Sequence, residues 1–407
     1  MVNQLSPKTK TNFNNSNNWL LINQYLKQLQ EETFVNEQKQ KQINSDNIFS
    51  NQKRLELALK ILKYGDFQQR WEVEKLFPKL GEVAIDYLIE ILENEDNELE
   101  YRWFAGKILR KFDHHKIVIS LVNLLQTTKE EELYEMTSDT LANLGGSAIQ
   151  GLSNLLIHSK HRLLATKTLA QIRHKDAILA LFTVVNDKDP RVRALAIEAL
   201  GSFQDEKIFP ILIEALNDNA SIVRKEAVSA LGFYKNTIQN AQLISHLEPL
   251  LGDINLEIAQ QTAISISRFN NEDAAKVLFK TLSSSLTPIP LQMTILKCLG
   301  WIEIEESLSY LEKAFNFVKE DSILEIIQIL GRFKKANLII QATNILINFY
   351  QSQHPSLNKP IIKAKLAYSL GNLGLKEAIQ TLEELEKDKD LSVSIHAISA
   401  LKKINYE

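Results

Sequence analysis

One segment of this chain occurs twice in close succession, and this repetition restricts the fold more than any other feature. The segment Asp189–Gly201 recurs about 31 residues later, and the two copies align without a gap from Asn186 and Asn217 onward. Repeats of this length are helix pairs that bury their apolar faces against the next pair. The sequence therefore predicts a helical solenoid, a fold that favours an extended binding surface over an enclosed pocket.

The apolar residues of each copy fall on one stripe at helical spacing. In the copy that begins at Asp189, this stripe consists of Val192, Ala196, Ala199, Leu200 and Phe203. Asp189 is placed to cap the helix, and Pro190 suits its first turn. Looser copies continue the series, which gives about ten helix pairs. These further copies are residues 66–80, 98–112, 130–144, 158–172, 255–269, 287–301, 318–332, 358–372 and 389–403.

The first 50 residues differ in composition from the rest. Asn and Gln dominate residues 1–50, which have too little apolar surface to offset the entropy of an ordered chain. An apolar stripe between Trp19 and Leu29 predicts a short helix that caps the first repeat. We therefore expect a largely flexible N-terminal extension over residues 1–50 and the solenoid over residues 51–407.

Composition and motifs disfavour several classes of function. The formal net charge of −3 provides no electrostatic footprint for nucleic acid. No apolar run approaches the ~18 residues of a membrane span, and the N-terminus lacks a secretion signal, so we expect a cytoplasmic protein without a membrane segment. Cys298, the single cysteine, lies at a small buried position of the repeat. Neither metal-ligand spacing nor a Gly-rich phosphate loop occurs, so we expect no metal and no cofactor.

An arginine recurs at one position of the repeat, and a fixed charge of this kind predicts pairing with acidic groups in the adjacent turn. Such pairs would form a ladder along the stack. The members are Arg70, Arg102, Arg162, Arg193 and Arg224.

Two adjacent copies carry a tryptophan directly after this arginine. Stacked helices lie about 10 Å apart, so Trp71 and Trp103 should be neighbours on the concave surface. Phe104 and several lysines surround them in the sequence, among them Lys75 and Lys107. An aromatic floor beside cations suits a flat, conjugated, anionic ligand. The alternative interpretation is that both tryptophans belong to the core near the end of the stack.

Carboxylates follow the tryptophans in the next copy. Glu135 and Asp139 lie one turn apart on one face of a helix, where they would accept hydrogen bonds from ring N–H groups. Asp321 occupies an exposed position in a later copy.

The pattern Asp-x-x-Val-Arg-x-x-Ala-x-x-Ala-Leu-Gly resembles the short variety of HEAT repeat, an α–α superhelix. Together with the segments Arg102–Ala105 and Leu144–Ile149, it resembles the E/F-type phycobilin lyases. The length and the single-chain layout look like those of the long members that act on phycoerythrin. The resemblance covers roughly residues 50–407.

The resemblance implies an enzyme that attaches phycoerythrobilin through a thioether to a cysteine of a phycoerythrin subunit, with the α-subunit favoured. The attacking thiol would belong to this client, and the lyase would hold the bilin in position. Asp139 and Glu135 are the expected acid–base residues, with Asp321 as a third. The expected bilin contacts are the stacking rings of Trp71, Trp103 and Phe104 and the propionate-binding Lys75, Lys107 and Arg102. Arg102 also has the competing role in the arginine ladder.

Three other functions fit the same sequence. A lyase-isomerase would convert the bilin to phycourobilin while attaching it. A non-catalytic scaffold or assembly chaperone would bind no bilin and would tolerate Trp103→Ala. A repeat subunit could also regulate an unrelated enzyme.

Overall fold

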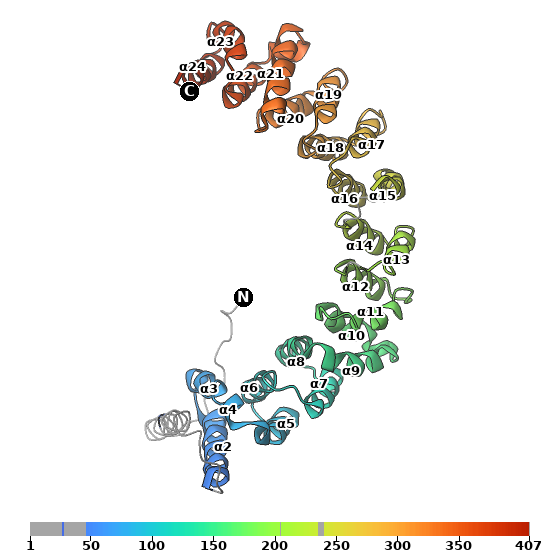
Figure 1. The fold of residues 1–407 in the computed structure, drawn as a ribbon, viewed down its shortest axis with the longest axis vertical. Coiled ribbons are helices and arrows are strands. Elements are labelled where there is room, and N and C mark those ends of the chain that lie inside the picture. The colour runs from blue at the N-terminus through green and yellow to red at the C-terminus, as the bar shows by residue number, and fades with distance from the viewer. Residues whose placement is uncertain (1–26, 28–45, 204, 235–239, 407) are drawn as a thin grey trace. The chain divides into compact units, whose positions relative to one another are not determined.

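The structure, a computed structural model, describes residues 27, 46–203, 205–234 and 240–406, and within these ranges every regular element is a helix (Figure 1). The predicted all-α fold is therefore confirmed. The predicted capping helix near Trp19 and most of the extension over residues 1–50 lie outside the described residues.

The chain divides into two compact units, Met1–Val184 and Val185–Glu407. The helices described in the first unit are α2 (Asp46–Tyr64), α3 (Phe67–Glu74), α4 (Phe77–Leu80), η1 (Glu82–Ala84), α5 (Ile85–Glu93), α6 (Leu99–Leu109), α7 (His115–Thr127), α8 (Glu131–Leu144), α9 (Gly146–Leu156), α10 (Ser159–Gln171) and α11 (Ala177–Phe182). Those described in the second unit are α12 (Pro190–Gly201), α13 (Phe209–Ala215), α14 (Ser221–Leu231), α15 (Asn240–Leu247), η2 (Glu248–Gly252), α16 (Leu256–Ser267), α17 (Glu272–Leu282), α18 (Ile289–Trp301), α19 (Glu305–Ala314), α20 (Glu320–Leu330), α21 (Ala336–Gln351), η3 (Pro355–Asn358), α22 (Pro360–Leu373), η4 (Lys376–Ala378), α23 (Ile379–Glu386) and α24 (Leu391–Tyr406).

Helices of the same kind stack on one another within each unit (Figure 1). In the first unit, α3, α6, α8 and α10 pack in sequence, and α5, α7, α9 and α11 form a second row. In the second unit, the helices from α12 to α24 that carry the repeat pattern pack in the same way. In both units, we call the row of helices that carries the repeat pattern the first row. The predicted functional side chains lie on these helices.

The repeat that revealed the fold folds as its pattern predicts. The side chain of Asp189 accepts a hydrogen bond from the backbone N–H of Arg191, and Pro190 is the first residue of α12. The apolar stripe from Val192 to Leu200 is buried, whereas Phe203 is only half-buried. The stripe must be covered by the next helix pair, so each unit's core is a continuous layer between rows.

Small residues let the first-row helices approach closely. A β-carbon built on Gly201 would lie 2.4 Å from the β-carbon of Ala230 on the next helix. At Gly371, the corresponding distance to Ala400 is 2.5 Å. A larger residue at either position would push the two helices apart, which explains why glycine ends the repeat pattern.

In the last four copies of the repeat, the predicted range begins one residue before the N-cap of the helix. The helices there have their N-caps at Pro288, Lys319, Lys359 and Asp390. The first three of these residues make no side-chain capping hydrogen bond. Because proline and lysine are poor capping residues, the sequence contains no clear marker of where these helices begin.

Candidate functional site

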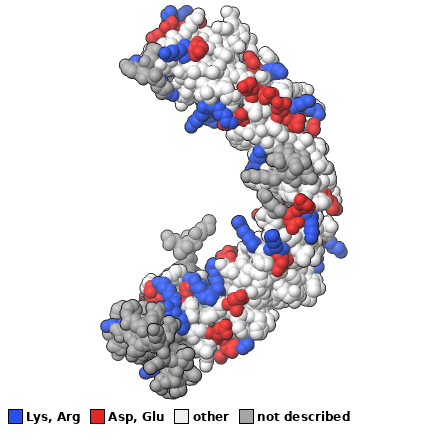
Figure 2. All heavy atoms as spheres, in the orientation of Figure 1, with Lys and Arg blue, Asp and Glu red and all other residues white. Residues whose placement is uncertain are grey.

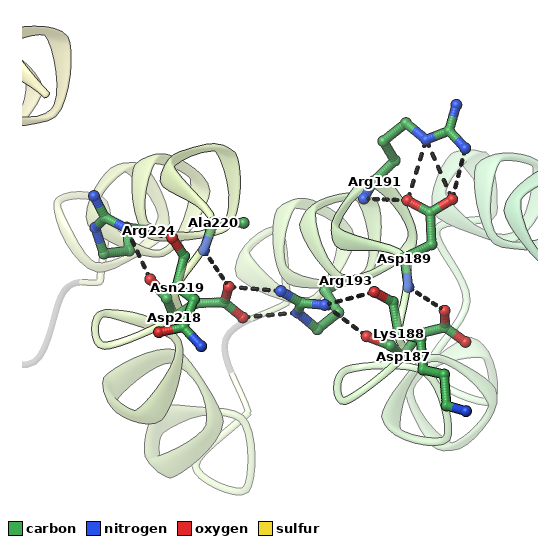
Figure 3. Close-up of polar contacts among 9 residues, drawn as sticks. All are labelled: Asp187, Lys188, Asp189, Arg191, Arg193, Asp218, Asn219, Ala220 and Arg224. Carbon is green, nitrogen blue, oxygen red and sulfur yellow. Dashed lines mark hydrogen bonds and ion pairs between the residues drawn. The ribbon is translucent and has the colours of Figure 1, made fainter.

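The recurring arginine forms the predicted ladder between adjacent repeats (Figure 3). Arg193, the fourth residue of α12, donates from Nε and Nη2 to the two carboxylate oxygens of Asp218, each at 2.7 Å. Its Nη1 donates to the backbone carbonyl of Asp187 at 2.6 Å. Asp218 in turn accepts the backbone N–H of Ala220 at 2.8 Å, which fixes the start of the next helix. Arg193 therefore connects the turn before its own helix to the turn before the next helix through Asp218.

Other repeats use the same position with different partners. Arg224 pairs with Asp253 at 2.8 and 2.9 Å, and the hydrogen bond from Arg224 lowers the pKa of the Asp253 carboxyl. Lys363 takes the place of the arginine in α22 and pairs with Asp388 at 2.6 Å. The predicted pairing of the arginine with an acidic group is confirmed at Arg193 and Arg224, and Lys363 adds a pair that was not predicted. The ladder is interrupted where the fourth residue of the helix is not basic, which is the case in α8, α16, α18, α20 and α24 (Tyr134, Ala259, Gln292, Ile323 and Ser394).

Arg102 is a buried member of the arginine series and does not lie on the surface where a ligand would bind. Its side chain is buried, and Nε donates to the backbone carbonyl of Leu92 at 2.9 Å. Arg70 is equally buried and contacts Glu98 and Glu100 at 3.0 and 3.1 Å. A guanidinium that is buried and bound to a carbonyl cannot reach a ligand on the surface, so the expectation that Arg102 holds a propionate does not fit its position.

The ladder also borders a cavity of about 470 Å³ that is lined by α12, α13 and the turns before α12 and α14. Its lining is polar and includes Arg193, Asp218 and Glu214. Since Arg193 and Asp218 satisfy one another, the cavity belongs to the structural framework.

Four aromatic rings from two adjacent repeats meet on α3 and α6, and we call them the aromatic cluster: Phe67, Trp71, Trp103 and Phe104. Phe67 stacks on Trp71 with ring centroids 6.0 Å apart. It meets the ring of Phe104 edge-on at 5.4 Å, and Phe104 meets Trp103 edge-on at 5.2 Å. Because Trp71 and Trp103 are the fifth residues of their helices, stacking of the repeats brings them to the same surface.

Lys107 lies at the centre of the aromatic cluster. Its Nζ is 3.2 Å from the centroid of the Trp71 ring and 5.2 Å from that of Trp103. It also lies 3.0 Å from Oε2 of Glu74, whose side chain is only 8% exposed. The Nζ atom itself is buried, and the contact with Glu74 lacks hydrogen-bond geometry. Lys107 is thus held by one carboxylate and by the negative faces of the indoles.

The members of the aromatic cluster differ in exposure. Trp71 is 39% exposed and Trp103 is half-buried, so neither is a core residue. Phe104 has no exposed surface, and the expectation that it points outward was wrong. Its ring is covered by Phe67 from the neighbouring helix and by Trp103. Phe104 therefore supports the indoles from below.

The remaining predicted residues lie on the surface. Lys75 is exposed and pairs with Glu72 at 3.0 Å on its own helix. Glu135 and Asp139 are exposed on α8, which packs against α6. Asp321 is exposed in the first turn of α20, in the second unit. Within the described part of the chain, the carboxylates of Glu135, Asp139 and Asp321 accept no hydrogen bond and form no ion pair.

Sequence reasoning missed two residues of this site, Phe67 and Glu74. Phe67 lies four residues before Trp71 on α3, and Glu74 lies three residues after it. Both spacings place side chains on one helix face. Helical spacing around Trp71 would therefore have identified them.

The described surface carries charges of both signs. Lys and Arg are interspersed with Asp and Glu over the visible face of each unit (Figure 2). No helix in the described ranges is long and apolar enough to cross a bilayer. Among the same residues, no group of three or more His, Cys, Asp and Glu side chains could hold a metal ion.

Comparison with known proteins assigns the class of fold. Residues 149–232, which include the Arg193–Asp218 pair, match the family of HEAT repeats. No curated protein sequence matches the chain. The protein is therefore an α-solenoid that contains HEAT repeats.

Several solved structures are similar to the chain at low identity. Human deoxyhypusine hydroxylase is 18% identical over 68% of this chain and 99% of its own, with a TM-score of 0.28. The karyopherin Kap121p is 17% identical over 88% of this chain and 48% of its own, with a TM-score of 0.48. Kap95p is 12% identical over 94% of this chain and 61% of its own, with a TM-score of 0.50. The chain spans about half the length of Kap121p, and at these identities the likeness concerns the fold alone.

Proposed function

We propose that this protein is a phycobilin lyase, in which the aromatic cluster on α3 and α6 holds a linear tetrapyrrole while a phycoerythrin subunit supplies the thiol. The observation that carries the proposal is the convergence of two indoles from adjacent repeats on one lysine, with Nζ of Lys107 3.2 Å from the Trp71 ring. Flat conjugated rings stack on indoles, and ligand carboxylates bind ammonium groups. The sequence resemblance to the E/F-type lyases supports the same ligand.

Lys107 gives this surface a way to respond to an anionic ligand. In the free protein, Glu74 balances its charge. A propionate of the bilin would compete with Glu74 for Lys107, and the lysine would uncover the Trp71 ring as it moved. Lys75, which is exposed and paired only with Glu72, would hold a second propionate.

The attachment is an addition in which atoms balance without an oxidant. The client thiol adds across the exocyclic double bond of ring A. The S–H bond breaks, a carbon–sulfur bond forms at the exocyclic carbon, and a proton is added to the ring carbon at the other end of the double bond. Glu135 and Asp139 on α8 would move these protons, with Asp321 as a third candidate. Most of the rate enhancement would come from holding bilin and thiol together.

The protein's own cysteine does not compete with the client. Cys298 is fully buried, and burial raises the pKa of its thiol to about 12. A neutral, buried thiol is a poor nucleophile, so the nucleophile must come from the other protein.

The decisive experiment is co-expression of this protein with a phycoerythrin α-subunit and a pathway that produces phycoerythrobilin. Covalent bilin is then detected by fluorescence on a denaturing gel. We expect a coloured subunit with the wild type and strongly reduced colour with Trp71→Ala and Trp103→Ala. Tyr87→Ala is the matched control, because Tyr87 is an exposed aromatic residue on α5 away from the cluster.

Two other outcomes would change the assignment. An absorption maximum shifted to the blue would identify a lyase-isomerase that forms phycourobilin. An uncoloured subunit, together with no spectral change when bilin is mixed with the purified protein, would favour the non-catalytic scaffold.

A further inference from the structure

A second surface, in the unit Val185–Glu407, alternates aromatic rings and guanidinium groups along the first row. Its four residues lie at the C-terminal ends of consecutive packed helices, from α14 to α20. They are Phe233, Arg268, Trp301 and Arg332, which we call the aromatic–arginine row. Phe233 is 58% exposed and Trp301 is 57% exposed, so these are surface rings rather than edges of the core.

The two arginines of this row differ from the other arginines of the unit. Arg191, Arg193 and Arg224 each pair with an aspartate. Within the described residues, Arg268 and Arg332 form no ion pair and donate no hydrogen bond. The guanidinium carbon of Arg268 lies 3.8 Å from the centroid of the Phe233 ring. Partial burial there lowers the pKa of Arg268, and no carboxylate offsets this cost.

The helix turns next to the row add one positive charge, and the nearest carboxylates on the same helix faces, Glu226 and Glu325, lie one turn further away. One turn before the row, the four helices carry Ser229, Ile264, Lys297 and Gln328. Lys297 is exposed and, in the described structure, unpaired. Three cations therefore lie beside two exposed rings, although the whole chain has a formal net charge of −3. Such local excess attracts a ligand of opposite charge.

We propose that the aromatic–arginine row binds an extended, acidic segment of a partner protein that carries carboxylates and apolar side chains on the same face. The carboxylates bind Arg268 and Arg332, and an apolar side chain of the same segment packs on Trp301. This surface is independent of the aromatic cluster in the other unit, and the inference does not rest on the proposed function.

The spacing of the cations favours a peptide over a small ligand. Packed helices are about 10 Å apart, so Arg268 and Arg332, two helices apart, are separated by roughly 20 Å. An extended chain covers this distance in about six residues, with side chains on alternate sides. The two propionates of one tetrapyrrole lie on neighbouring rings and are much closer together. One bilin therefore cannot bind both arginines.

The test uses the full chain and a fluorescein-labelled peptide of about ten residues that contains Glu-Ser-Leu-Ser-Leu-Ser-Glu, so that the glutamates and leucines share one face of the extended chain. Fluorescence anisotropy at low salt should show binding that weakens as salt is added. We expect the Arg268→Gln, Arg332→Gln double variant to bind at least tenfold more weakly, and Trp301→Ala to lose a similar factor. Arg191→Gln is the matched control, because Arg191 is equally cationic and exposed but pairs with Asp189, and it should bind like the wild type.

Two additional variants guard against misfolding, and three results would overturn the proposal. Arg332→Gln and Lys297→Gln alone change only exposed side chains and should each weaken binding severalfold. Equal affinity of the wild type for a peptide with Gln in place of Glu would show that charge is not recognised. Unchanged binding by the double variant would remove the row from the site. Tighter binding of a single-stranded oligonucleotide than of the acidic peptide would identify a nucleic-acid surface instead.

Discussion

Lys107 shows how one residue can decide the properties of a surface. It lies between two indoles and one carboxylate, and its Nζ atom has no contact with solvent. The indoles are rigid and amphipathic, so they present a large contact area without losing much conformational freedom on binding. Under the proposed function, a ligand carboxylate would have to displace Glu74 in order to bind Lys107.

We expect Lys107→Met to destabilise the protein by about 2–3 kcal/mol, because it leaves the carboxylate of Glu74 buried without a partner. Replacing both residues, as Glu74→Leu with Lys107→Met, should recover most of this loss. Lys75→Met is the control, since the exposed Lys75–Glu72 pair should contribute under about 1 kcal/mol. Urea unfolding followed by tryptophan fluorescence measures all three, and equal losses at Lys107 and Lys75 would contradict the buried pair.

Cys298 makes stability depend on alkaline pH. Its pKa is about 12 in the folded protein and about 8.5 in an unfolded chain. The folded state thus keeps a proton that the unfolded state loses, so the stabilising contribution is complete below pH ~8.5 and is lost as the pH rises towards 12. Between pH 9 and 10.5, the wild type should lose up to about 1 kcal/mol per pH unit more than Cys298→Ala. Parallel pH profiles of the free energy of unfolding would exclude this role of the thiol.

At the scale of the element, the fourth residue of several first-row helices connects two repeats. Arg193 contacts the turn before its own helix and the aspartate before the next one. The aspartate also accepts the backbone N–H of Ala220, so a single pair fixes both the start of α14 and its distance from α12. This arrangement explains why the arginine and the aspartate recur with the repeat.

A double-mutant cycle between Arg193→Met and Asp218→Ala should give a coupling energy of about 1–2 kcal/mol, because both side chains are only 16% exposed. The pair Arg191–Asp189, in which Arg191 is 68% exposed, should show much weaker coupling in the same cycle. Chemical unfolding of the four variants of each cycle provides the values. Additive changes in the free energy of unfolding would mean that the interaction between Arg193 and Asp218 does not stabilise the fold.

At the scale of the whole molecule, helix pairs pack against their neighbours in sequence within each unit. Stability in such an array is a sum of local repeat and interface terms, and distant repeats are only indirectly coupled. The ladder is interrupted at Ala259 and Ile323, where other contacts join the repeats. Among these contacts are the hydrogen bond from Gln260 to Thr294 and the ion pair of Glu320 with Lys359. A substitution that destabilises one repeat should therefore have little effect on the stability of distant repeats.

We expect Arg193→Ala to accelerate amide hydrogen exchange in α12 and α14 while leaving α22 and α24 unchanged. Lys363→Ala should have the opposite distribution, because Lys363 connects α22 to the turn before α24 through Asp388. Hydrogen exchange followed by peptide mass spectrometry resolves these helices. A uniform acceleration with either variant would show that the unit Val185–Glu407 unfolds as a single cooperative body.

The repeat fold and the arginine ladder could be predicted from the sequence because their causes are local and periodic. Asp189 caps its own helix, and Arg193 reaches the turns on either side of it, so a regular pattern of letters corresponds to a regular pattern of contacts. The same reasoning brought Trp71 and Trp103 to one surface. The alignment of the copies failed by one residue in the last four of them, and in three of these, as at Pro288 and Lys319, no side chain caps the helix.

Only the tertiary structure decided which of the predicted side chains are free. Phe104 is buried because Phe67 of the preceding repeat covers it, and Lys107 is paired because Glu74 lies opposite. Arg268 and Arg332 are unpaired in the described structure because no carboxylate from an adjacent repeat reaches them. Periodicity determines the direction in which a side chain points. What that side chain meets depends on the residue that the next helix places against it, and this is fixed only when the repeats stack.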